Sequence, residues 1–258
     1  MCGRFTLTMD PDQLLDFTAG MIVPGDIRPY LQPRYNIAPS NKVAVIANTG
    51  DLRLDLYRWG LIPSWATITK SEPTNTSRGY KSEKEGIIPD IGNRLINARA
   101  DTLDQKPSFR TAYRKQRCLI LADGFYEWWF DEKENRKIPF FFYLKETDPD
   151  KQRMRKPFAF AGLWDRWVRR EDGTEIRSCT IITTTPNEVV ASVHGRMPVI
   201  LPPETYEEWL SPTDRPKKGA DDPLLVPYKA EDMLRYPVSR RVNSPDIDDS
   251  QCVEEVQY

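Results

Sequence analysis

The run Cys118-Leu119-Ile120-Leu121-Ala122 continues directly into Asp123-Gly124-Phe125-Tyr126-Glu127-Trp128-Trp129. The first part is a continuous apolar run of strand length, which predicts a buried β-strand. The second part places Glu127 among aromatic side chains immediately after that strand. An apolar setting raises the pKa of a carboxyl group towards the range useful for proton transfer, so Glu127 is a candidate proton shuttle. The alternative is a solvated carboxylate at the end of a strand.

Further strands are predicted on both sides of this run. Residues 42–47 and 52–58 read as a hairpin across a polar turn at 48–51, because apolar and polar residues alternate in its second arm. Aromatic and β-branched residues favour three more strands, at 139–144, 158–163 and 178–183. Short helices are predicted at 12–17 with Asp10 as N-cap, at 108–115, at 187–193 after a capping box of Thr185 to Glu188, and at 204–210.

These strands interleave with short helices and do not alternate as βαβ units. The pattern therefore predicts a single α+β domain with largely antiparallel sheet and short peripheral helices. We place the domain at residues 1–240. Within it, the polar segment 67–93 is expected to be a mobile insertion. Residues 241–258 form an acidic C-terminal tail that is expected to fray from residue 246 onward.

Composition excludes several classes of protein. With 37 basic and 38 acidic residues the net charge is -1, so an anionic partner would have to be held by a local patch and not by bulk charge. No apolar run approaches a membrane span and no signal-peptide pattern opens the chain, which predicts a cytoplasmic protein. Four scattered cysteines without a CxxC pair and a single histidine argue against a zinc site, so we expect no metal and no cofactor.

Cys2 is a candidate nucleophile because of its position. Once Met1 is removed, Cys2 carries a free α-amine and a thiol on adjacent carbons. The amine can add to an aldehyde to give a Schiff base, and the thiol can close onto the imine carbon as a thiazolidine. Gly3 permits close approach of a ligand, and Arg4 adds a permanent cation. The alternative is that the cysteine is incidental.

Other polar and aromatic residues carry weaker signals. His194 follows a predicted helix, where it would either act as an acid and base or simply stabilise the helix end through the dipole. Asn97 could hold an amine or a sugar hydroxyl, or serve as a turn residue. Trp59 and Trp65, with two breaks around them, suit base stacking, and several arginines suit phosphate contacts, although most such residues in proteins do neither.

Six segments containing these residues occur in the order expected for the SOS-response-associated peptidase (SRAP) family, which the chain resembles over residues 2–239. The resemblance implies a fold with a barrel-like core. It also implies a sensor and shield of abasic sites in single-stranded DNA that cross-links to the aldehyde of the abasic sugar, with abasic-site lyase, self-reversal and peptidase-like processing as associated activities. The segments are Met1-Cys2-Gly3-Arg4-Phe5, Arg34-Tyr35-Asn36-Ile37-Ala38-Pro39, Trp59-Gly60-Leu61-Ile62-Pro63-Ser64-Trp65, Ile96-Asn97-Ala98-Arg99, Ala122-Asp123-Gly124-Phe125-Tyr126-Glu127-Trp128 and His194-Gly195-Arg196-Met197-Pro198.

The resemblance also implies roles for individual residues. Cys2 is similar to the family's nucleophile, Asn97 to its positioning residue, Glu127 to its proton shuttle and His194 to its acid and base. Thr183 falls where the family places an active-site hydroxyl, a looser match because Thr184 and Thr185 adjoin it. The DNA-binding residues implied are Arg4, Pro39, Trp65, Arg99 and Arg196.

Three functions remain open from the sequence. Covalent capture of abasic sites is favoured, with damaged single-stranded DNA as the partner and a monomer as the acting form. A cysteine peptidase would pair Cys2 with His194. A non-covalent reader of single-stranded DNA would need the aromatic and arginine residues but not Cys2.

Overall fold

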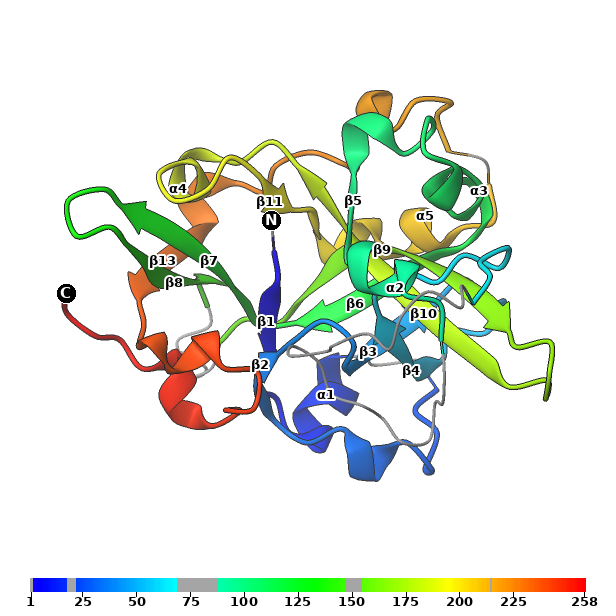
Figure 1. The fold of residues 1–258 in the computed structure, drawn as a ribbon, viewed down its shortest axis with the longest axis horizontal. Helices are drawn as coiled ribbons and strands as arrows, with labels where there is room; N and C mark the ends of the chain where they lie inside the picture. The colour runs from blue at the N-terminus through cyan, green and yellow to red at the C-terminus, as the bar shows by residue number, and fades with distance from the viewer. Residues whose placement is uncertain (1, 18–21, 69–87, 147–154, 214) are drawn as a thin grey trace.

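The computed structural model describes residues 2–17, 22–68, 88–146, 155–213 and 215–258, which form two β-sheets (Figure 1). The smaller sheet has five strands in the order β13-β8-β7-β1-β2, and every pairing in it is antiparallel. Its strands are β1 (Arg4–Leu7), β2 (Arg34–Ile37), β7 (Gly124–Asp131), β8 (Arg136–Leu144) and β13 (Met233–Pro237).

The larger sheet closes on itself as a barrel. Strand β10 pairs with β4 on one side and with β9 on the other, which completes the ring β10-β4-β3-β6-β9. Only the β4–β10 pairing within this ring is parallel. The α+β class, the antiparallel sheets and the barrel-like core are thereby confirmed. The strands are β3 (Lys42–Ala47), β4 (Leu54–Trp59), β6 (Arg117–Ala122), β9 (Phe158–Val168) and β10 (Glu175–Thr184), joined at the rim by β5 (Asn97–Arg99), β11 (Met197–Pro198) and β12 (Ile200–Leu201).

Short helices lie around the two sheets (Figure 1). The α-helices are α1 (Pro11–Phe17), α2 (Ile91–Arg94), α3 (Pro107–Lys115), α4 (Glu188–Ala191) and α5 (Tyr206–Leu210). The 3-10 helices are η1 (Arg28–Tyr30), η2 (Ala100–Thr102), η4 (Pro203–Thr205), η5 (Gly219–Asp221), η6 (Ala230–Asp232), η7 (Arg240–Asn243) and η8 (Ser250–Val253). Among the described residues, no helix is long and apolar enough to span a membrane.

Two local predictions are corrected by these helices. The capping box was placed at Thr185, but α4 begins later, and the Asn187 side chain caps it by accepting from the Val190 N–H at 2.9 Å. The predicted insertion at 67–93 ends in a helix, because α2 begins at Ile91. The greater part of that insertion, residues 69–87, lies outside the described residues.

The chain crosses from the barrel to the smaller sheet at Asp123, the single residue between β6 and β7. The Asp123 carboxylate accepts from the Thr6 and Thr8 hydroxyls and from the Thr8 N–H, so it fixes β1 beside β7. Gly124 follows where a Cβ would lie 2.1 Å from the Phe141 ring, so only glycine fits there. This junction brings the N-terminal end of β1 to the centre of the molecule, between the sheets (Figure 1).

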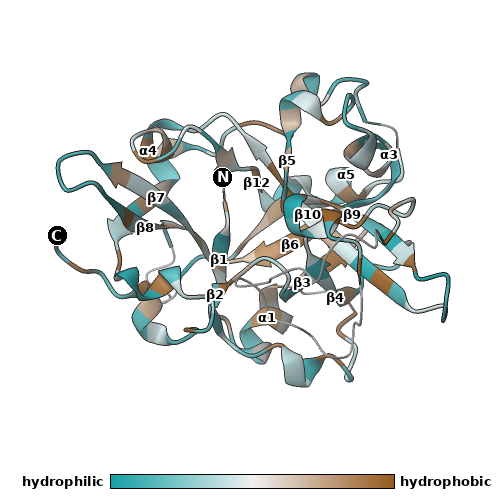
Figure 2. Ribbon diagram, viewed as in Figure 1, coloured by the Kyte–Doolittle hydropathy of each residue, from teal (hydrophilic) through white to brown (hydrophobic). Residues whose placement is uncertain are grey.

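Apolar strand residues form the core of both sheets (Figure 2). Phe5 of β1 joins the sheets by edge-to-face contacts with Trp59 (5.1 Å between centroids) and Phe160 (5.7 Å) of the barrel. Trp59 is fully buried, and its indole N–H donates to the Ile96 carbonyl at 2.9 Å. Trp59 is therefore not available for base stacking.

The acidic C-terminal tail does not fray. The Asp248 carboxylate accepts from the backbone N–H groups of Tyr35 (2.6 Å) and Asn36 (2.8 Å) and pairs with Arg34. Cys252, in η8, is fully buried. Fraying was predicted from charge alone, but carboxylates that meet backbone N–H groups and an arginine stabilise such a segment.

Candidate functional site

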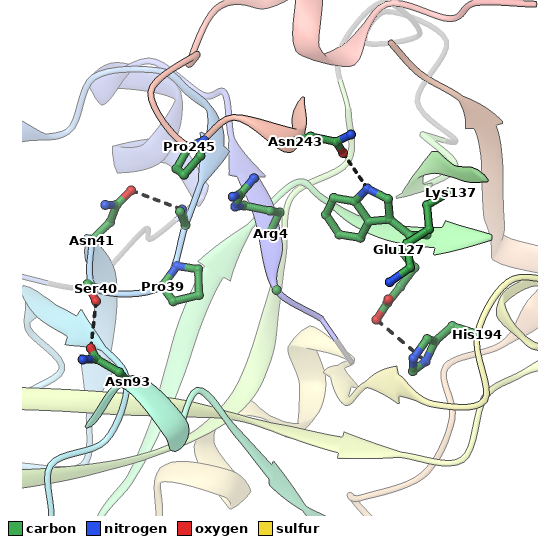
Figure 3. A pocket seen from close by; sticks show the side chains of 13 residues that line it. Arg4, Pro39, Ser40, Asn41, Asn93, Glu127, Lys137, His194, Asn243 and Pro245 are labelled. Carbon is green, nitrogen blue, oxygen red and sulfur yellow. Dashed lines mark hydrogen bonds and ion pairs between the residues drawn. The ribbon is translucent and has the colours of Figure 1, made fainter. Parts of the chain in front are cut away.

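A cavity of about 630 Å³ opens where the smaller sheet meets the barrel (Figure 3). Its walls come from the start of β1, the turn after β2, the end of α2, the edge of β7, the segment after α4 and the C-terminal segment. The lining residues are Gly3, Arg4, Ala38, Pro39, Ser40, Asn41, Asn93, Glu127, Trp128, Lys137, His194, Asn243 and Pro245.

Cys2 lies beside this cavity and is fully buried. Arg4 is in register with Tyr126, so the two residues before Arg4 run alongside Glu127 and Trp128 on β7. The Cys2 thiol donates to the Arg4 carbonyl at 3.6 Å, and the Asn97 amide donates to the Cys2 carbonyl at 2.8 Å. Burial raises the pKa of the Cys2 thiol far above its ordinary value, and the nearby Glu127 charge raises it further.

Glu127 and His194 form a pair at the cavity wall. Glu127 is 2 % exposed, and its carboxylate lies 4.0 Å from the His194 Nδ1 (Figure 3). Burial raises the pKa of Glu127, and His194 opposes that rise. Glu127 is therefore not a solvated carboxylate at a strand end. A carboxyl group in this setting keeps its proton to higher pH than usual and can act as an acid as well as a base.

His194 is held by backbone contacts after α4. Its own N–H donates to the Val190 carbonyl at 2.8 Å, and its Nδ1 accepts from the Arg196 N–H at 3.1 Å. The side chain still reaches the cavity. His194 lies three residues beyond the end of α4 at Ala191, which is compatible with both interpretations offered for it. Its place beside Glu127 at the cavity is what suits it to act as an acid and base.

Thr183 and the two outer arginines form a cluster next to this pair. Thr183 is buried on β10, in register with Arg99 of β5. Arg196 donates from its Nε to the Thr183 hydroxyl at 3.3 Å and lies 3.6 Å from the Asp101 carboxylate, which also pairs with Arg99 at 2.7 Å. The Thr183 hydroxyl thus accepts from Arg196 and donates to the Ala98 carbonyl at 3.4 Å, and Arg196 in turn contacts His194.

Of the remaining predicted DNA-binding residues, two line the cavity and one does not. Arg4 and Pro39 line the cavity, and the Arg4 guanidinium is fixed by the Asn36 side chain (3.3 Å) and the Val242 carbonyl (2.5 Å). Trp65 is 57 % exposed and is not among the lining residues. The structure therefore gathers Cys2, Asn97, Glu127, His194, Thr183, Arg4, Pro39, Arg99 and Arg196 through contacts or shared strands, and leaves Trp65 outside that group.

Sequence reasoning missed several of the lining residues. Trp128 follows Glu127 directly and could have been found from that neighbour, and its indole N–H donates to Asn243 at 2.8 Å. Lys137 gives the cavity a second cation beside Arg4. Ser40, Asn93 and Asn243 carry no motif signal, because each reads as an ordinary turn residue.

The described part of the chain contains no group of histidine, cysteine and carboxylate side chains that could hold a metal ion. What the cavity offers is a buried thiol at the chain's N-terminal end, a proton-exchanging pair and cations. This set suits covalent reaction of an electrophile that carries negative charge.

Comparison with known proteins identifies the family of the chain. The chain is 42 % identical to the abasic site processing protein YoqW of Bacillus subtilis (strain 168), covering 98 % of this chain and 99 % of that protein. It is 30 % identical to the abasic site processing protein HMCES of Xenopus tropicalis, covering 98 % and 78 % respectively. A crystal structure of a protein from Bacteroides thetaiotaomicron superposes with a TM-score of 0.78 at 27 % identity, covering 99 % of this chain and 100 % of that one. The profile of the SOS response associated peptidase (SRAP) family matches residues 1–245, and the chain belongs to that family.

Proposed function

We propose that this protein processes abasic sites in single-stranded DNA by cross-linking to them through Cys2 after Met1 has been removed. One observation carries the proposal: Asn97 holds the Cys2 backbone near the buried Glu127, which pairs with the partly exposed His194 in a cavity that Arg4 also lines. The names of the related proteins, which refer to abasic site processing, support the same substrate.

The covalent step balances without a redox partner. The neutral α-amine of Cys2 adds to the aldehyde carbon of the ring-opened abasic sugar, and loss of one water gives the imine. The Cys2 sulfur then bonds to the imine carbon while the thiol proton passes to the nitrogen, so the products are a thiazolidine and water. An α-amine has an ordinary pKa of about 7.7 to 8.0, so a useful fraction is already nucleophilic at neutral pH.

Proton transfer is the task left for Glu127 and His194. The aldehyde is masked as a cyclic hemiacetal, so ring opening requires a proton on the ring oxygen and removal of one from the hydroxyl. Glu127, whose pKa is raised by burial, is suited to donate the first proton. Once ionised, it can accept the Cys2 thiol proton, which the high pKa of that thiol otherwise retains. His194, at 4.0 Å, exchanges protons with Glu127.

Phosphate contacts are proposed for the cations at and near the cavity. Arg4 and Lys137 line it, and Arg99 and Arg196 lie beyond His194. Because the net charge is only -1, binding depends on this local group. Pro39 faces the reacting groups from the opposite wall, where it would contact a nucleotide next to the lesion, and the exposed Trp65 indole offers a surface for a base further along the strand.

The direct test is incubation with an oligonucleotide that contains one abasic site, followed by a denaturing gel. The wild-type protein should give a stable adduct with single-stranded DNA and none with an undamaged strand. The Cys2→Ala variant should give no adduct without borohydride, and only a reducible imine with it. Retarded DNA on a native gel without any adduct would favour the non-covalent reader, and an adduct of unchanged yield in Cys2→Ala would contradict the mechanism.

A further inference from the structure

Ser40 has an unusual backbone conformation at the edge of the cavity. Its φ is +76°, in the left-handed region, which costs a residue with a side chain roughly 1–2 kcal/mol. The other described non-glycine residue with positive φ is Asn135, in the turn between β7 and β8, and asparagine tolerates this region comparatively well. A conformation of this kind persists only where the surrounding structure holds it, and it often does so at functional sites.

Arg58, on β4, holds Ser40 in place. Arg58 is 4 % exposed, and its guanidinium donates to the Ser40 hydroxyl at 2.8 Å and to the side-chain amide oxygen of Asn93 at 2.9 Å. The Ser40 hydroxyl also donates to Asn93 at 3.3 Å. A backbone contact also holds Ser40, since the Ser40 N–H donates to the Trp59 carbonyl at 2.8 Å.

The approach of Asn93 to Arg58 depends on Gly60. Gly60 has φ +121°, and a Cβ there would lie 2.3 Å from the Gly92 carbonyl oxygen and 2.9 Å from the Arg58 guanidinium. The bare backbone of Gly60 therefore lets the end of α2 lie against β4. Two segments that are distant in sequence, the turn after β2 and the end of α2, are in this way tied to one buried cation.

We propose that Arg58 is a positioning residue for DNA bound in the cavity, an inference that rests on the proposed function. Arg58 is not among the residues that line the cavity, so it acts through Ser40 and Asn93, which are. Together with Pro39 these two residues form a rim opposite Glu127 and His194 (Figure 3). A rim fixed before DNA arrives sets how the abasic sugar lies relative to Cys2.

Loss of the Arg58 contacts should therefore lower the rate of cross-linking more than the affinity for DNA. Misplacement of a reacting group by about 1 Å can cost a factor of about 100 in rate. The Arg58→Met variant, which keeps a long side chain but removes the donors, should cross-link roughly tenfold more slowly at saturating single-stranded abasic oligonucleotide. The DNA concentration for half-maximal rate should change less than about twofold, because the cations that bind phosphate are untouched. Asn93→Ala, at an exposed position, should act in the same direction.

A double-mutant cycle separates this role from general support of the fold. Glycine adopts a left-handed conformation without strain and needs no arginine to hold it. In a Ser40→Gly background, Arg58→Met should therefore cost less than about threefold in rate, against roughly tenfold alone. Asn135→Gly is the matched control, because it relieves left-handed backbone strain at a residue that does not line the cavity, and it should leave the rate unchanged.

Each outcome of these experiments either supports or overturns the role of Arg58. Rates of Arg58→Met and Asn93→Ala within twofold of wild type, equal losses in both backgrounds, or a loss expressed only as weaker binding would each overturn the inference. If Arg58→Met fails to melt cooperatively, Asn93→Ala decides the question. If the wild-type protein itself forms no adduct, the proposed function fails first, and this inference fails with it.

Discussion

The Asp248 carboxylate provides a quantitative test of how the C-terminal segment is held. Replacing it with alanine removes the acceptor for two backbone N–H groups, those of Tyr35 and Asn36, and the ion pair with Arg34. Hydrogen bonds to a charged group contribute about 1.5–3 kcal/mol each. Because the Asp248 side chain is 22 % exposed, water replaces part of that loss, and we expect a net cost of about 3 kcal/mol. For a domain of this size that corresponds to a Tm lower by roughly 6–12 °C.

Thermal unfolding followed by circular dichroism measures the effect, with urea denaturation to obtain the free energy difference. Asp246→Ala is the control, since Asp246 is an exposed residue of the same charge in the same segment. The loosened segment should also weaken DNA binding, because the Val242 carbonyl fixes Arg4. A Tm within 1–2 °C of wild type, or equal losses for Asp246→Ala and Asp248→Ala, would show that charge alone, and not this clamp, determines the stability of the segment.

Three further predictions concern the reaction and its DNA contacts. An uncleavable extension before Cys2 should abolish the adduct with every side chain intact, as intact-mass spectrometry and a denaturing gel will show; a tagged protein that reacts at the normal rate would rule out the α-amine. Glu127→Gln should slow cross-linking while leaving binding of undamaged DNA unchanged. Burial raises the pKa of Glu127 in the folded state, so ionising Glu127 costs the wild-type protein stability that the glutamine variant keeps. The free energy of unfolding of the variant relative to wild type should therefore increase as pH rises above 4.5 and show no such increase below it. Urea unfolding below and above pH 4.5 tests the sign. Arg99→Ala and Arg196→Ala should each flatten the slope of log affinity against log salt by about 0.7, and unchanged slopes would assign both arginines a structural role.

The parts of the fold that the sequence predicted are those with strong local patterns. The apolar run of β6, the alternation in β4 and the aromatic residues of β8 fixed their strand type, and those strands occur where expected. Antiparallel pairing followed from the short connections. The closure of the barrel by a parallel β4–β10 contact could not be predicted this way, since the two strands are far apart in sequence and nothing local marks their register.

Residues of the candidate site could be predicted only where a reactive residue type stands in a distinctive sequence setting. Cys2, Glu127 and His194 met that condition, and the structure places them together. Arg58 did not, because a charged residue at the end of an amphipathic strand reads as solvent-exposed, and its burial depends on acceptors contributed by Ser40 and Asn93. The burial of Trp59 could not be predicted either, since an indole beside a glycine in a motif gives no indication of which side of a sheet it faces.

The burial of Cys2 has a consequence for the order of events during synthesis. Strand β7, which covers the N-terminal end of β1, begins at Gly124, 120 residues after Arg4. At roughly 5–20 residues per second, ribosomes need about 6–24 s to add that length, and during this interval the start of the chain has no partner in β7. Cys2 is thus exposed early in synthesis and buried once β7 has formed. In the proposed chemistry, the interval before β7 forms is therefore the period in which Cys2 is most accessible to the aminopeptidase that frees its α-amine.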